Sequence, residues 1–348
     1  MISTVLKTII GTLLVQLTLV VLVFGTVNPE GDLWGNVFPT VTPVSRAQKI
    51  RLLAAWEKRA PVQGLIIGSS RSMELDPAAF EKATGHRYFN FGVTRGTAED
   101  VDAILTLVER RYARPRELVL DIDPVMLSDY GLPSELTDNW VMAPIIEHQQ
   151  PTLKWKIEHA GRLLRKSLTP DYAREVGMSI LAAIRNANTL REFRPDGRVV
   201  YRTRDKEIAE GRYDRDGQVR RCIKEMTDSL VETHQFDRTN PHRLALLDSA
   251  LARAGAEGIR VTVWMPPRHP KLDSTFAEFP VAEAWLRDLP KQVGAVAAKH
   301  GASFIDLSHV QNFQGDPNDF YDCVHYGSAN AARITEILLA NRPTSPAN

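Results

Sequence analysis

The chain has few cysteines and no surplus of charge of either sign. Cys222 and Cys323 are the two cysteines among 348 residues, and neither belongs to a Cys-x-x-Cys pair or to a spacing typical of zinc sites. The formal net charge is +1, from 43 Lys and Arg residues against 42 Asp and Glu residues. A chain so close to neutrality lacks the basic surface of nucleic-acid-binding proteins, so we expect no nucleic-acid partner.

Several motifs are also missing. The sequence contains no Gly-x-x-x-x-Gly-Lys-Ser/Thr, no Gly-x-Gly-x-x-Gly and no His-Glu-x-x-His. These absences argue against a nucleotide-phosphate loop and a zinc-protease site, and we expect no cofactor and no metal. There is no internal repeat or low-complexity tract, while the apolar and charged fractions are those of ordinary globular proteins.

One long apolar run is present at the N-terminus. Thr8 to Val27 is twenty residues without a charge, about the length that a helix needs to cross the hydrocarbon core of a bilayer. Lys7 precedes the run, and Glu30 and Asp32 follow it. This asymmetry places the N-terminus in the cytoplasm and the rest of the chain outside the cytoplasmic membrane, in the periplasm or at the cell surface.

Two other interpretations of this run remain. A cleaved signal peptide usually has a shorter apolar region and a small-x-small cleavage site such as Ala-x-Ala, which is missing after Phe24. The second alternative is a buried helix of a soluble protein. We expect a single-pass signal anchor at 1–27, a stalk rich in Pro, Gly, Thr and Val at 28–44, and a folded domain at 45–348. In an oxidising compartment the two cysteines could form a disulfide, and two unpaired thiols are an equal alternative.

From residue 45 onward, short apolar runs alternate with amphipathic segments. Strands are predicted at 65–67, 88–91, 118–122, 259–265 and 304–307, with helices between them. This alternation is typical of an α/β fold, here a flavodoxin-like three-layer domain with a five-stranded, mostly parallel sheet.

A large, partly helical insertion at about 128–238 separates the third strand from the fourth. Residues 150–225 hold 18 Lys and Arg against 11 Asp and Glu. This local surplus suits an anionic glycan or the headgroups of an acidic leaflet, although a solvated helical face would also show it. Asp-Gly at 196–197 predicts a β-hairpin within 194–204.

The polar residues that could take part in catalysis lie at the ends of predicted strands and before the last predicted helix. Ser69 and Ser70 come after the first strand, Gly92 ends the second, and Asp322 and His325 precede the last helix. Ligands of open α/β sheets bind beyond the carboxyl ends of the strands. A hydroxyl, an imidazole and a carboxylate are the groups of hydrolytic triads. A serine-rich loop and a structural histidine are the plainer alternatives.

These pieces, in this order, resemble the SGNH, or GDSL-like, hydrolase superfamily. Gly68-Ser69-Ser70 is similar to its Gly-Asp-Ser block, Gly92 to its glycine block, and Asp322-Cys323-Val324-His325 to its Asp-x-x-His block. The resemblance covers about 62–127 and 255–341. It implies that Ser70 is the nucleophile, His325 the general base and Asp322 the orienting carboxylate, with the N–H groups of Ser70 and Gly92 in the oxyanion hole.

The third block departs from the family pattern. The family has Gly-x-Asn-Asp there, whereas this chain has Asp121-Ile122-Asp123-Pro124, and an ionised carboxylate cannot donate a hydrogen bond to an oxyanion. With Gly-Ser-Ser and the N-terminal helix, this departure resembles the membrane-anchored SGNH-like proteins of bacterial envelopes. They include the D-alanyl-transfer protein of teichoic acids and the O-acetylation factors of exopolysaccharides.

That resemblance implies an extracytoplasmic, serine-dependent O-acyl transferase or esterase. Its substrate would be a cell-envelope polysaccharide or a related acyl ester, and its partner a polytopic membrane acyltransferase. The alternative is a non-catalytic SGNH-fold protein that binds glycan or acts as a scaffold for that acyltransferase. A simple exported lipase would need a broad apolar groove, which the charged insertion does not suggest.

Three further residues are candidate substrate contacts. Arg71 and Arg95 flank the predicted site and could bind an anionic group of the substrate, or pair with nearby acids. His269 follows the fourth strand but has no carboxylate at short spacing. We expect it to contact substrate or to shape its loop.

Overall fold

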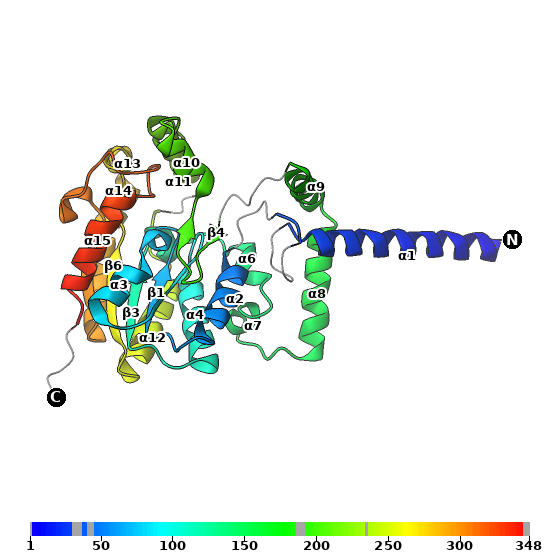
Figure 1. Cartoon of the computed structure of the whole chain (residues 1–348), viewed down its shortest axis with the longest axis horizontal. Coiled ribbons are helices and arrows are strands. Elements are labelled where there is room, and N and C mark those ends of the chain that lie inside the picture. The colour runs from blue at the N-terminus through cyan, green and yellow to red at the C-terminus, as the bar shows by residue number, and fades with distance from the viewer. Residues whose placement is uncertain (1, 30–36, 40–44, 186–191, 234–235, 344–348) are drawn as a thin grey trace.

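The computed structural model describes residues 2–29, 37–39, 45–185, 192–233 and 236–343. The predicted stalk at 28–44 lies for the most part outside the described residues. Helix α1 (Ile2–Val27) projects from the rest of the chain, as Figure 1 shows. Its segment Val5–Val27 is long and apolar enough to span a membrane.

A five-stranded sheet forms the centre of the domain. Its strands are β1 (Gly64–Gly68), β2 (Tyr88–Gly92), β3 (Glu117–Asp121), β6 (Arg260–Met265) and β7 (Ser303–Asp306). Every predicted strand is confirmed to within one residue at each end. The strand order is β2-β1-β3-β6-β7 and every pairing is parallel. This is the flavodoxin-like strand order, in which the direction of winding reverses beside β1.

Helices cover both faces of the sheet. Because side chains alternate along a strand, Leu65 and Ile67 point to one face and Ile66 to the other. The first face packs against α4 (Ala98–Arg111), α12 (Pro241–Ala256) and α14 (Pro280–Lys299). The second packs against α3 (Pro77–Thr84) and α15 (Ser328–Ala340). Burial on both faces explains why the strands are continuously apolar instead of alternating with polar residues.

Local signals in the sequence set the helix boundaries. Asp76 accepts a hydrogen bond from the Ala78 N–H at the start of α3, and Gly85 ends that helix in a left-handed conformation. Thr97 and Asp100 form a reciprocal capping box on α4.

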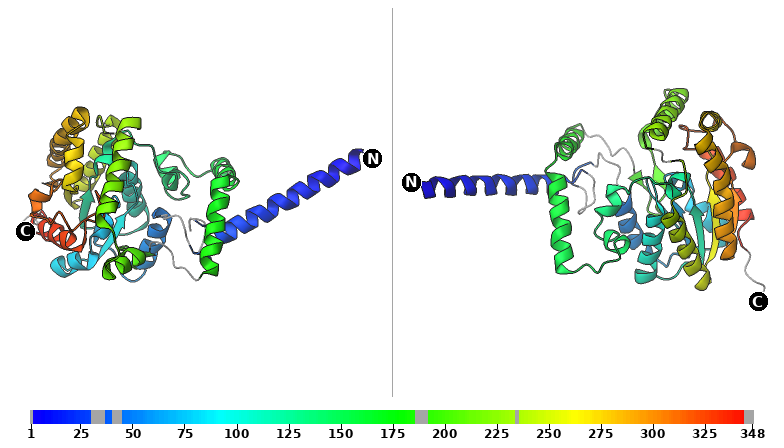
Figure 2. Two further views of the ribbon diagram at one scale, coloured as in Figure 1. Left: turned by 90° about the horizontal axis from the view of Figure 1, so that it is seen from above. Right: turned by 180° about the vertical axis from the view of Figure 1, so that it is seen from behind.

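The insertion between β3 and β6 is mainly helical. Its helices α8 (Leu153–Ser167) and α9 (Pro170–Ile184) lie beside the end of α1, apart from α10 (Arg202–Ala209) and α11 (Arg215–Thr233), as Figures 1 and 2 show. It also contains the predicted hairpin, since β4 (Glu192–Phe193) pairs antiparallel with β5 (Val199–Val200) around Asp196 and Gly197. The Asp196 carbonyl accepts a hydrogen bond from the Asn90 N–H, so the hairpin continues the edge of β2.

The helices between β3 and β6 are α5 (Pro124–Leu127), α6 (Ser134–Thr137), α7 (Ala143–Ile146), α8 (Leu153–Ser167), α9 (Pro170–Ile184), α10 (Arg202–Ala209) and α11 (Arg215–Thr233). Helix α2 (Arg46–Glu57) precedes the sheet, and α13 (Pro270–Phe276) follows β6. Two 3₁₀ turns are also present, η1 (Ser72–Glu74) and η2 (Val310–Phe313).

A buried ion pair attaches α2 to the first turn of α4. Arg46 Nε and one terminal nitrogen each lie 2.7 Å from an oxygen of Asp100, and the two side chains are 0% and 1% exposed. Arg46 also donates to the Thr94 carbonyl at 3.2 Å and contacts Glu135 at 3.2 Å. The guanidinium therefore holds together α2, α4, the loop after β2 and α6.

Replacing Arg46 with Met should lower the free energy of unfolding by about 3–5 kcal/mol, because Asp100 is left buried without its cation. The measurement is the urea midpoint of the full chain in detergent. Arg114→Met is the matched control, since Arg114 is 67% exposed and its pair with Glu257 should contribute less than about 1 kcal/mol. Equal midpoints for the two variants would contradict the importance of the buried pair.

Candidate active site

Ser70 lies in the turn between β1 and η1, where the carboxyl ends of β1 and β3 come together. A side chain at position 68 would place its Cβ 2.3 Å from the Cβ of Asp121, so only glycine permits this approach. The Ser69 hydroxyl and backbone N–H both donate to Asp121 Oδ2, at 2.9 and 3.0 Å. These bonds fix the turn and leave the next residue, Ser70, partly exposed at the edge of the sheet.

His325 and Asp322 lie in the loop that precedes α15. Asp322 Oδ1 accepts hydrogen bonds from the N–H groups of Val324 and His325, at 2.8 and 2.7 Å. Its Oδ2 lies 2.7 Å from His325 Nδ1. The loop is joined to the serine turn by the Tyr326 hydroxyl, which donates to the Arg71 carbonyl at 2.6 Å.

The structure brings Ser70, His325 and Asp322 into one hydrogen-bonded line. Ser70 Oγ lies 2.8 Å from His325 Nε2, although the two residues are 255 positions apart. Burial alone raises the pKa of Asp322, but the charge and hydrogen bond of His325 and the two backbone N–H groups lower that pKa to about 2. An ionised Asp322 only accepts hydrogen bonds, so Nδ1 carries the imidazole proton and Nε2 can accept the Ser70 proton.

A cavity of about 530 Å³ opens beside these three residues. Helix α11 forms one wall, and the polar or charged side chains that it contributes are Gln218, Arg221, Glu225 and Ser229. Sequence reasoning did not find this wall. Cys222 is the signal that could have found it. A disulfide between Cys222 and Cys323 places α11 beside the predicted site, because Cys323 lies between Asp322 and His325.

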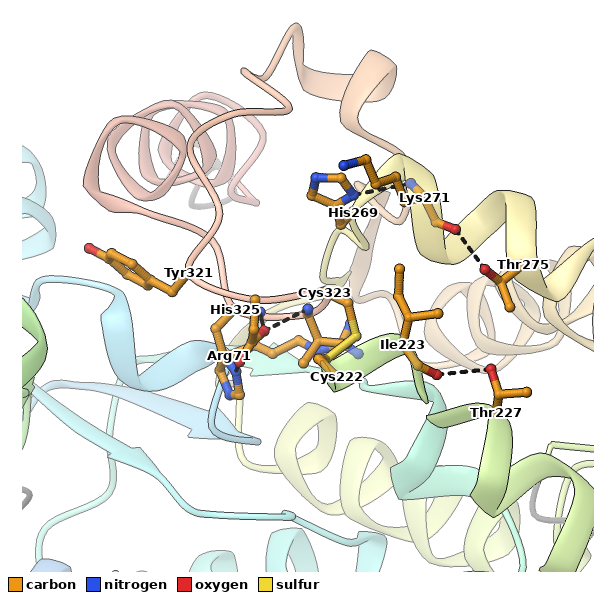
Figure 3. Close-up of a disulfide and its surroundings, with 12 residues drawn as sticks. Arg71, Cys222, Ile223, Thr227, His269, Lys271, Thr275, Tyr321, Cys323 and His325 are labelled. Carbon is orange, nitrogen blue, oxygen red and sulfur yellow. Dashed lines mark hydrogen bonds and ion pairs between the residues drawn. A yellow bond between two sulfur atoms is a disulfide. The ribbon is translucent and has the colours of Figure 1, made fainter. Parts of the chain in front are cut away.

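The disulfide between Cys222 and Cys323 attaches α11 to the histidine loop. The Cα atoms of the two cysteines are 5.6 Å apart and their sulfur atoms are bonded. The sequence left a disulfide and two unpaired thiols as alternatives, and the structure contains the disulfide. Figure 3 shows the disulfide beside Arg71 and His325. The bond connects residues 101 positions apart and fixes the cavity wall against the segment that carries the imidazole.

The predicted oxyanion donor Gly92 is not directed at the cavity. Its N–H donates to Asn90 Oδ1 at 2.9 Å, and it is not a lining residue. Gly96, in the same loop, does line the cavity, and a Cβ there would lie 2.7 Å from the Gly68 carbonyl oxygen. In the described ranges, no acceptor is bonded to the backbone N–H of Ser70 or of Gly96.

The three candidate substrate contacts have different positions. Arg71 is buried with its Nε 2.9 Å from Asp123 Oδ2, so it pairs with a nearby acid at the base of the cavity. Arg95 is exposed at the cavity, and no ion pair involves it within the described part of the chain. His269 is outside the cavity lining and stands apart from His325 in Figure 3. Its Nδ1 accepts from the Lys271 N–H at 3.0 Å, which makes it the N-cap of α13.

Two carboxylates, Asp121 and Asp123, meet at the end of β3, where the Ser69 hydroxyl lies 2.9 and 3.2 Å from one oxygen of each. Burial, followed by the charge of Asp123, raises the pKa of Asp121 to about 7, against the opposing effects of Arg71 and Ser69. Neither side chain supplies a neutral amide donor to the cavity.

No protein-family model matches this chain, and no curated protein gives a significant match to it.

Asp121→Asn should stabilise the protein at neutral pH and not near pH 4. The native-state pKa of Asp121 exceeds its unfolded value, so folding becomes less favourable as pH rises from about 4 to 7. An asparagine does not ionise, so the variant does not lose stability in this way. Its free energy of unfolding should therefore exceed that of the native chain by an amount that grows between pH 4 and 7, to the order of 3 kcal/mol. Urea titrations at pH 4.5 and 8 measure it. Asp288→Asn, at an exposed carboxylate, is the control; a pH-independent difference for Asp121→Asn would contradict the assignment.

Reduction of the Cys222–Cys323 bond should lower the free energy of unfolding by about 2–5 kcal/mol, because it releases a long closed loop in the unfolded chain. The urea midpoint with and without dithiothreitol measures this change. The double variant Cys222→Ala, Cys323→Ala should have the lower midpoint in both conditions. A midpoint of the native chain that reductant does not alter would show that the bond adds no stability.

Proposed function

We propose that this protein is a membrane-anchored serine-dependent acyl-ester hydrolase or O-acyl transferase of the SGNH type. The observation that carries the proposal is the line of Ser70 Oγ, His325 and Asp322, with distances of 2.8 and 2.7 Å. A hydroxyl, an imidazole nitrogen within hydrogen-bond distance of it and an ionised carboxylate are the parts that acyl transfer through serine requires. Their order along the chain and the parallel sheet support the SGNH assignment.

In the proposed first step, Ser70 Oγ attacks the carbonyl carbon of an acyl ester while its proton passes to His325 Nε2. The tetrahedral intermediate collapses by breaking the ester C–O bond, and His325 returns the proton to the leaving alcohol. In the second step His325 takes a proton from water or from an acceptor hydroxyl, which attacks the acyl-Ser70 carbonyl. Ser70 leaves with the proton from His325, so the enzyme returns to its starting state.

The unbonded N–H groups of Ser70 and Gly96 are the proposed donors to the oxyanion, with Gly96 in place of the expected Gly92. The third donor of the SGNH pattern is replaced by Asp123, which is engaged with Arg71. Loss of one such donor costs on the order of 10²-fold to 10³-fold in rate. A slow enzyme with a single dedicated acceptor fits this arrangement better than a fast general esterase.

The disulfide and the N-terminal helix support a location outside the cytoplasmic membrane, since stable disulfides form mainly in oxidising compartments. Arg95 and Arg221 are exposed at the cavity and suit an anionic acceptor. We therefore propose a cell-envelope polysaccharide as substrate, and a polytopic membrane acyltransferase as the partner that delivers the acyl group.

A fluorophosphonate probe should label the full-length protein in detergent, and Ser70→Ala should reduce labelling by about 10⁴-fold or more. Ser274→Ala, which removes an exposed hydroxyl on α13, is the matched control and should label normally. Urea midpoints of both variants check that they are folded. Full labelling of Ser70→Ala would reject Ser70 as the nucleophile.

One observation favours a second candidate function, that of a non-catalytic glycan-binding or scaffold protein. Asp123, paired with Arg71, stands where the SGNH pattern has an oxyanion donor. Polymer acetylation in cells separates the two. If acetylation is lost on deletion of the gene but unchanged in a Ser70→Ala strain, the scaffold function holds. If both strains lose acetylation while the variant protein is present at its normal level, the catalytic function holds.

A further inference from the structure

Helix α8 carries an apolar stripe that faces solvent. Leu153 is 75% exposed, Ile157 64%, Leu168 49% and Leu164 37%. Their spacing of four, seven and four residues places them in a single row along the helix and its C-cap. Exposed apolar side chains are common singly on proteins, but a row of this length marks an interaction surface.

The opposite side of α8 is packed against the domain. Trp155 and His159 are buried, and their ring nitrogens bond to Glu147 Oε2 at 2.7 Å and to the Asp138 carbonyl at 2.9 Å. These bonds fix the rotation of the helix about its own axis. The apolar stripe therefore points away from the domain.

Helix α9 continues this surface and contacts the membrane helix. Tyr172 is buried with its ring centroid 5.6 Å from that of Phe24, in the last turn of α1. On the other side of α9, Met178, Leu181 and Ile184 are exposed. The amphipathic helix is thus attached to α1 by its buried side and presents its exposed side outward.

The position of α1 relates this surface to a bilayer. Figures 1 and 2 show α8 lying crosswise at the C-terminal end of α1, on the side of the domain from which α1 projects. The segment Val5–Val27 is about 35 Å long at 1.5 Å per residue, slightly more than the roughly 30 Å hydrocarbon core. When α1 crosses the bilayer, its last turn, and with it Tyr172, lies at the level of the headgroups.

We propose that α8 and α9 lie flat on the surface of the bilayer that α1 crosses, with their exposed apolar side chains in the boundary between headgroups and acyl chains. The charge of α8 fits anionic headgroups, because it has five Lys and Arg residues and one Glu. Lys154, Lys156 and Arg165 are exposed beside the stripe, where long side chains can reach the headgroups while the apolar residues are buried. This inference depends on the anchor and is independent of the chemistry at Ser70.

The test uses the full chain, alone, in vesicles of phosphatidylethanolamine and phosphatidylglycerol. A fluorophore is attached to Ile157→Cys, and lipids with a nitroxide near the headgroup are added as quenchers. The native cysteines form a disulfide and do not react with the label. The matched control is Val281→Cys on α14, which is 59% exposed on a helix remote from α1 in Figure 1.

Quenching at position 157 should exceed that at position 281 by at least about threefold, since only the first label reaches the lipid. Equal quenching at the two positions, in vesicles that contain the protein, would overturn the proposal. Quenching that appears only after a second membrane protein is added would also overturn it, because that protein would then be what covers the apolar side chains of α8 and α9. Adding Leu153→Asp and Leu164→Asp should reduce the signal at position 157, whereas Val281→Asp should not. An unchanged signal in the double Asp variant would also overturn the proposal.

Discussion

The hydrogen bond from the Tyr326 hydroxyl to the Arg71 carbonyl joins the two loops on which the candidate site depends. One loop presents the Ser70 hydroxyl and the other the His325 imidazole, and no shared secondary structure holds them together. Tyr326 is fully buried, and an unpaired phenol or carbonyl at that depth would be costly. The disulfide attaches the histidine loop to α11 as well. The Ser70–His325 distance is thus determined by contacts behind the reacting atoms.

Much of the fold is encoded locally, and those features could be predicted. The five strands follow from apolar runs, and the capping box of Thr97 and Asp100 marks a helix start that depends on neighbouring residues alone. Ser70, Asp322 and His325 could be singled out because each follows or precedes a predictable element at the same edge of the sheet. The sequence carries no direct information on the distance between them, which depends on the parallel strand order and on the contacts between the two loops.

The features that sequence reasoning missed depend on contacts between distant segments. Gly92 ends β2 and Gly96 lies in the loop that follows, and the sequence does not show that the Asn90 side chain occupies the N–H of Gly92. The burial of Arg46 on α2 has no local signal, because its partners Asp100 and Glu135 lie 54 and 89 positions away in the chain. His269 became the N-cap of α13 because Pro270 begins that helix, a local signal that could have been recognised.

The place of Cys323 in the sequence has a consequence for biogenesis. A polypeptide emerges from the ribosome N-terminus first, and its early segments begin to fold while later ones are still being made. Here the serine turn and α11 both precede the histidine loop in the chain. The relay is therefore completed only after the histidine loop has emerged, so no shorter nascent form of the protein holds a finished site.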